Sequence, residues 1–159
     1  MSTVIPNKTF ENMIQSAHTL CREIENLDLK NTQPLVSALI RLLYAANNLA
    51  QSPINAEDYD LGTCVILPDA LNRIPDNMIF QVVFDPLDPQ SICATSLRDP
   101  LADIYKPLAL GLQAIDNEKQ KELAVLLEWS QGYKYHWGRH LIDVIRYFLL
   151  CPGIEKAGQ

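Results

Sequence analysis

The chain has few of the residues with which small enzymes build tight ligand-binding loops. Glycine accounts for 6 of the 159 residues, and no glycine-rich phosphate loop or nucleophile turn occurs. The four cysteines are far apart, without the paired spacing of zinc or redox sites; they are Cys21, Cys64, Cys93 and Cys151. We expect them to be buried, reduced thiols. The sequence therefore gives no indication of a bound cofactor.

Long hydrophobic runs are also missing. The most apolar late segment, LIDVIRYFLL (141–150), contains Asp143 and Arg146 and is too short to cross a bilayer. The first residues, MSTVIPNKTFENM, lack the basic start and apolar core of a secretory signal. We therefore expect a cytoplasmic protein without a membrane partner. Its length suits one domain over residues 1–159, with a flexible tail at 153–159.

Basic residues are scarce in the middle of the chain. Residues 51–90 contain seven acids and a single base, Arg73, so this segment carries the whole net charge of −6. An acidic surface repels phosphate backbones, which argues against nucleic-acid binding. It could attract a basic protein partner, with Glu57, Asp58 and Asp60 as candidate contacts. The alternative, which the sequence favours, is that the charge serves solubility alone.

Apolar residues at helical spacing predict an all-α protein, a compact helical bundle with an irregular, proline-rich and acidic middle. The expected helices cover about 8–27, 32–49, 96–115 and 117–150. Ser96, followed three residues later by Asp99, is typical of a helix start. Five of the ten prolines lie in residues 51–90 and exclude long regular elements there. Whether TCVIL (63–67) and MIFQVVF (78–84) are strands or buried helix turns stays open.

The last predicted helix carries a regular stripe of aromatic and polar side chains. Its members recur at steps of four and three residues: Trp129, Tyr133, His136, His140, Asp143 and Tyr147. We call this stripe the polar seam. A solvent-facing surface would not place aromatics and histidines so regularly, so we expect the polar seam to be buried or half-buried.

Two segments resemble a known family. FDPLDPQSICATSLRDPLADIYKPLALGL (84–112) and LEWSQGYKYHWGRHLIDVIRYF (127–148) are similar to the bacterial domain-of-unknown-function family 5063. Its members carry a Ser-Leu-x-Asp-Asp-Leu-Ala-Asp-Ile-Tyr element, matched by residues 96–105, and a His-Trp-Gly-x-His element, matched by 136–140. Pro100 replaces one acid of the first element, and Pro107 interrupts the helix that follows. The resemblance implies a mainly helical fold and no particular activity.

The two histidines of the polar seam have two principal interpretations. His136 and His140, one helical turn apart, could bind a metal ion with Asp143 and with Asp103 from the preceding helix. Alternatively, the two acids accept hydrogen bonds from the rings and tyrosine hydroxyls in a structural polar network. The sequence favours the network, and a binding pocket is a third reading.

Two classes of function remain. The first is a non-enzymatic protein–protein interaction module, for example an immunity-type inhibitor of a basic toxin. The second is a metal-dependent enzyme that uses the His/Asp cluster. The absence of catalytic motifs favours the first class, so we expect no enzyme. The oligomeric state is not predicted.

Overall fold

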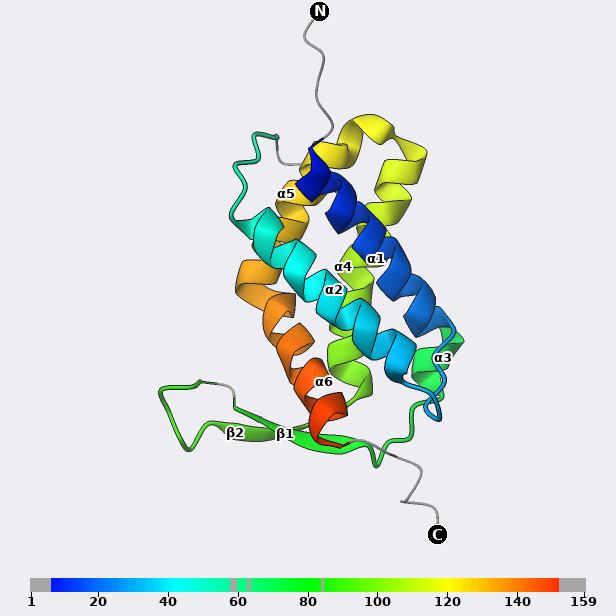
Figure 1. Ribbon diagram of the computed structural model, residues 1–159, viewed down its shortest axis with the longest axis vertical. Coiled ribbons are helices and arrows are strands. Elements are labelled where there is room, and N and C mark those ends of the chain that lie inside the picture. Colours follow the sequence, from blue (N-terminus) through cyan, green and yellow to red (C-terminus); the bar gives the residue numbers. More distant parts are fainter. Residues whose placement is uncertain (1–6, 58–59, 63, 84, 152–159) are drawn as a thin grey trace, which may run out of the picture.

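The protein packs its long helices side by side and lays a small two-stranded sheet across one end of the bundle (Figure 1). The structure is a computed structural model and describes residues 7–57, 60–62, 64–83 and 85–151. In chain order the elements are α1 (Lys8–Glu25), α2 (Gln33–Ala50), α3 (Asp69–Asn72), β1 (Ile79–Val83), β2 (Ile92–Ser96), α4 (Arg98–Asn117), the 3-10 turn η1 (Lys119–Lys121), α5 (Glu122–Gly132), the π-helical turn η2 (Tyr133–Trp137) and α6 (Gly138–Leu150). The predicted compact, mainly helical fold is confirmed. In the part of the chain that is described, no helix is long and apolar enough to cross a membrane.

The first two helices pack on each other through one apolar face each. The side-chain oxygen of Asn7 caps α1 by accepting a hydrogen bond from the Thr9 amide at 3.1 Å. α2 has no side-chain cap, but Pro34 lies in its first turn, where a missing N–H costs nothing. The core side chains of the pair are almost fully buried and include Met13, Ala17, Leu20, Ile24, Leu35, Leu39, Leu42, Ala46 and Leu49. Their removal from water is the main stabilising term.

The middle of the chain is less irregular than predicted, because it contributes α3 and the first strand of a hairpin. β1 and β2 are antiparallel, with Val83 opposite Ile92 and Ile79 opposite Ser96. MIFQVVF (78–84) therefore contains a strand over 79–83, whereas the described part of TCVIL, 64–67, is neither helix nor strand. The ring of Phe80 packs on Tyr147, with centroids 5.1 Å apart, and this contact attaches the hairpin to α6.

α4 begins two residues later than the sequence predicts. Ser96 still belongs to β2, and the helix starts at Arg98. The hydroxyl oxygen of Ser96 nevertheless accepts a hydrogen bond from the Asp99 amide at 3.3 Å, so the predicted capping contact forms. The helix then continues through Pro107 to Asn117.

The prediction of one continuous helix from Asn117 to Leu150 is wrong in two places. Glu118 has extended backbone angles (φ −144°, ψ 98°) and separates α4 from the next turn. The π-helical turn at Tyr133–Trp137 then separates α5 from α6. Because a π turn bonds residue i to residue i+5, it inserts an extra residue and changes which side chains share a face. Trp129, which belongs to the predicted polar seam, and Trp137, which does not, consequently both lie in the core.

The four cysteines are free, but the expectation that all of them are buried is wrong for three. Cys21 lies in the α1 core face, while Cys64, Cys93 and Cys151 are exposed. Cys93 is on the hairpin, and Cys64 and Cys151 lie in a loop and just after α6. These segments lie outside the packed bundle, so their side chains remain accessible.

Candidate functional site

The packing of α4 against α5 sets the position of Asp103, one of the two acids predicted to lie beside the histidines. The indole Nε1 of Trp129 donates a hydrogen bond to the backbone oxygen of Pro107 at 2.9 Å. The indole fits there because residue 111 is glycine: a Cβ at Gly111 would lie 2.6 Å from the same nitrogen. Asp103 lies one turn before Pro107 on α4. The contact therefore holds Asp103 beside the chain that carries the histidines.

The π turn η2 presents His136, and glycine at position 138 makes the turn possible. A Cβ at Gly138 would lie 2.2 Å from the carbonyl oxygen of Tyr133, far inside van der Waals contact. The backbone can approach that oxygen only where no side chain intervenes. His136 lies within the turn, and His140 lies in the first turn of α6. Gly138, between the two histidines, is thus a structural requirement of this turn.

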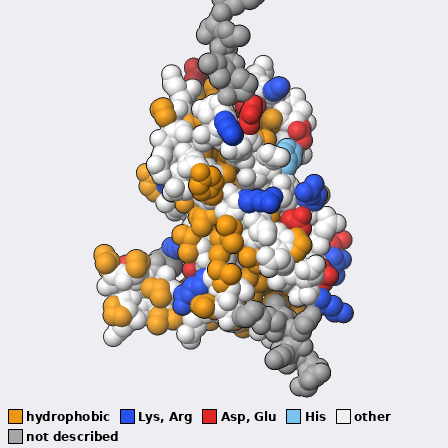
Figure 2. Space-filling view, in the orientation of Figure 1, with side chains coloured by type: hydrophobic (Ala, Val, Ile, Leu, Met, Phe, Trp, Pro, Cys, Tyr) orange, Lys and Arg blue, Asp and Glu red, His pale blue; other side chains and the backbone are white. Residues whose placement is uncertain are grey.

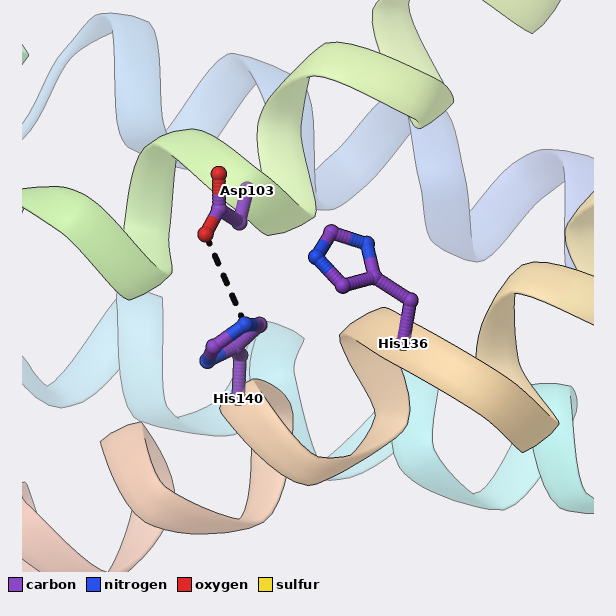
Figure 3. Close-up of side chains that lie close together, drawn as sticks. All are labelled: Asp103, His136 and His140. Carbon is purple, nitrogen blue, oxygen red and sulfur yellow. Dashed lines mark ion pairs between the residues drawn. The ribbon is translucent and has the colours of Figure 1, made fainter. Parts of the chain in front are cut away.

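Asp103, His136 and His140 converge on one another (Figure 3). His140 Nε2 lies 3.4 Å from Asp103 Oδ2, and one ligand atom from each of the three residues lies within 4.8 Å of the others. The two imidazole rings are nearly perpendicular, with centroids 5.2 Å apart. Asp103 and His140 are partly buried and His136 is exposed, so the cluster opens to solvent on one side.

Asp143, the fourth predicted metal ligand, is not part of this group of atoms. It lines a neighbouring cavity of about 200 Å³ between the hairpin and α6, together with His140, Arg139, Pro100 and Cys93. His140 thus belongs to both the cluster and the cavity wall.

Burial dominates the electrostatics of this region. It lowers the pKa of His140 below its ordinary value of 6.5, and the nearby Asp103 carboxylate opposes part of that effect. Burial also raises the pKa of Asp143 above its ordinary value of 3.8, against the influence of His140 and two arginines. A neutral imidazole has a free lone pair, so His140 can accept a hydrogen bond or bind a metal ion.

The polar seam is not uniformly half-buried. Trp129 lies in the core; Tyr133, His140, Asp143 and Tyr147 are intermediate, and His136 is exposed. Among the described residues, its side chains meet mainly through rings: Tyr133 on Trp137, His136 on His140, and Tyr147 on Phe80 and Phe148. Through the Asp103–His140 contact, an acid of α4 reaches the polar seam.

Sequence reasoning missed a second candidate region, the outer face of the hairpin. Ile79, Val83 and Ile92 point away from the bundle and are exposed, as is Leu87 in the loop between the strands. We call these four residues the hairpin surface. Figure 2 shows hydrophobic side chains gathered on the hairpin at the lower left of the molecule. Burial alternates along 79–83, but this is visible only in the structure, since a short apolar run does not reveal which of its side chains stay exposed.

The acidic residues of the middle segment are divided between separate parts of the surface. Glu57 and Asp60 are exposed in the segment after α2, which leaves the bundle at the end opposite the hairpin (Figure 1), and Asp58 lies outside the described residues. Asp85 and Asp88 are exposed in the hairpin loop. Residues 51–90 therefore do not form one continuous acidic face.

The comparison with known proteins identifies the family. The family model described as "Domain of unknown function (DUF5063)" matches residues 5–150, and the chain belongs to this family. No curated protein and no solved structure matches the chain significantly. The resemblance seen in the sequence is thus confirmed for the family.

Proposed function

We propose that this member of the DUF5063 family is a non-enzymatic protein-interaction module that docks through the hairpin surface. The observation that carries the proposal is the apolar outer face itself. Val83 and Ile92 are cross-strand partners and both are exposed, and Ile79 extends the face along β1. Apolar side chains gathered on one exposed face are characteristic of a binding site. A two-stranded sheet also offers free backbone edges.

The described part of the loop between the strands, residues 85–91, is held by its own hydrogen bonds. The hydroxyl of Ser91 accepts a hydrogen bond from the Asp85 amide at 2.7 Å and lies 2.8 Å from the backbone oxygens of Asp85 and Asp88. The carboxylates of Asp85 and Asp88 accept hydrogen bonds from the amides of Leu87 and Gln90, both at 2.9 Å. A loop that is already ordered loses little conformational entropy when a partner binds.

The charges around the hairpin surface favour a basic partner. Within the described part of the chain, neither Asp85 nor Asp88 forms an ion pair with a lysine or arginine. An apolar centre beside unpaired carboxylates suits a partner with apolar side chains surrounded by lysine and arginine. Inhibition of a basic toxin, as an immunity protein performs, is one role of this kind.

Site-specific photo-crosslinking in the native host would test the docking surface. We would place a photoreactive amino acid at Leu87, which is 91% exposed, and at Ile66, which is 93% exposed but lies in the loop before α3. We expect a basic protein to be crosslinked from position 87 and not from position 66. The substitution Ile92→Lys should abolish that crosslink without changing the melting temperature.

The second measurement is the rate at which the protein associates with the partner identified by crosslinking. Association should slow as salt rises, since screening shortens the reach of charges to about 10 Å at 0.1 M. Asp85→Asn with Asp88→Asn, which removes the charges and keeps an acceptor oxygen for the loop hydrogen bonds, should reduce the association rate, whereas Glu57→Gln with Asp60→Asn should not. Equal crosslinking from both positions, or loss of binding only in the Glu57/Asp60 variant, would refute the proposed surface.

A metal-dependent enzyme is the second candidate function. The convergence of Asp103, His136 and His140 favours it, as does the cavity of about 200 Å³ that His140 also lines. Such an enzyme would need both a bound ion and a substrate in that cavity. Metal binding is therefore its first requirement.

A further inference from the structure

Three side chains of the metal-binding types meet at the boundary between the π turn and α6. They come from two separate parts of the chain: Asp103 from α4, and His136 and His140 from the π turn and α6. Their ligand atoms lie within 4.8 Å of one another. Figure 3 shows the imidazole of His136 directed toward the space beside Asp103 and His140. The cluster requires the tertiary fold and is not a product of local sequence alone.

The spacing of these atoms is close to that of a metal site. In a tetrahedral site with bonds of about 2.1 Å, two ligand atoms are separated by about 3.4 Å. His140 Nε2 and Asp103 Oδ2 already stand 3.4 Å apart. His136 is exposed, so its ring can turn toward the other two without disturbing the core. Only a small side-chain movement separates this arrangement from coordination.

An ion pair between Asp103 and His140 explains why these two side chains lie together. It does not explain why His136 lies beside them. Among the described residues, His136 contacts the ring of His140 and forms no hydrogen bond or ion pair. If both imidazoles were protonated, their contact would not stabilise the fold, because like charges repel. A shared cation would satisfy all three side chains.

We propose that Asp103, His136 and His140 together bind one divalent transition-metal ion of the class that prefers imidazole, with Zn²⁺ as the reference ion. Two nitrogen ligands and one carboxylate favour such ions over Mg²⁺ and Ca²⁺, which take oxygen ligands. Three protein ligands leave at least one coordination position for water, and the exposed side of the cluster provides room for it. The site is independent of the proposed docking role, because none of its residues lies on the hairpin surface.

Titration of Zn²⁺ and Co²⁺ into protein purified without an affinity tag and treated with a chelator would test the site. We expect one ion per chain, no competition by Mg²⁺, and a higher melting temperature with Zn²⁺. His136→Ala should weaken binding by at least about tenfold, the loss that removal of even an outer-shell partner can cause. Because His136 is exposed, this variant should keep the wild-type circular dichroism spectrum.

The chain offers a matched control, since its third histidine, His18, is also exposed and lies on α1. His18→Ala should leave Zn²⁺ affinity unchanged, and Asp103→Asn should lower it. Alkylation of the exposed cysteines, which could bind Zn²⁺ adventitiously, should also leave it unchanged. The proposal is overturned if no ion binds at about 100 µM, if His136→Ala binds as tightly as wild type, or if alkylation abolishes binding.

Discussion

Replacement of Gly138 by alanine is the sharpest test of the π turn. In a regular exposed helix, Gly→Ala stabilises by about 1 kcal/mol. Here the new Cβ would lie 2.2 Å from the Tyr133 carbonyl oxygen, so the backbone must move by roughly 0.8 Å to restore even a 3.0 Å contact. If the turn instead reverts to a regular helix, one of the two buried tryptophans rotates out of the core, which costs about 3 kcal/mol. The net expectation is a loss of about 2 kcal/mol.

Urea unfolding followed by tryptophan fluorescence and far-UV circular dichroism would measure this loss. For a domain of this size, about 2 kcal/mol corresponds to a decrease in Tm of about 4–8 °C. Asn47→Ala, at an exposed position inside α2, serves as the control and should change stability by less than about 0.5 kcal/mol. If Gly138→Ala were more stable than wild type by about 1 kcal/mol, the close backbone approach at Tyr133 could not be a feature of the folded protein.

Two further predictions concern the core. Trp129→Phe should cost about 1 kcal/mol more than Trp137→Phe in urea unfolding, because the Trp129 indole donates to Pro107, whereas the buried Trp137 Nε1 has no partner among the described residues. Equal losses would refute a stabilising role for the bond. Iodoacetamide at about pH 8 should modify the three exposed cysteines and spare Cys21 until the protein unfolds. Burial raises the pKa of Cys21 from 9.0 to about 12, so its contribution to stability is present below pH 9 and is lost as pH rises toward 12. The Tm of Cys21→Ala should therefore fall less steeply over that range than the Tm of wild type, and an equal fall in both would refute the contribution.

The helices and much of the core could be predicted because they depend on local rules. Apolar residues at three- and four-residue steps locate α1, α2 and α4, and Pro34 and Ser96 indicate two of the helix starts. The hairpin could not be predicted with the same certainty. Its pairing depends on residues on both sides of a loop, and the apolar run at 78–84 fits a strand or a helix turn equally well. Its exposed outer face is a tertiary property, since it depends on where the bundle ends.

The break between α5 and α6 was missed for a different reason. A regular helix turns 100° per residue, so eight residues would place Trp137 about 80° around the axis from Trp129. That separation puts Trp137 outside the polar seam to which Trp129 belongs. The wider π turn rotates less per residue, which brings both indoles into the core. The free energy gained by burying two large aromatic rings exceeds the preference for regular α-helical hydrogen bonds. The periodicity of apolar residues does not show which of these two effects is larger, so it could not predict the π turn.

The same helix geometry explains why three of the four predicted ligands converge and the fourth does not. His136 and His140 are four residues apart, so they share a face on adjacent turns, and Asp103 reaches them from α4. Asp143 is seven residues beyond His136, and at 1.5 Å per residue its Cα lies about 10 Å farther along the axis. Ligand atoms on one ion are at most about 4 Å apart. A single ion bound by His136 is therefore out of easy reach of Asp143, which lines the cavity beneath the hairpin. The distance along the helix axis explains this division, which the sequence analysis did not predict: His136 belongs to the cluster, Asp143 to the cavity, and His140 contributes to both.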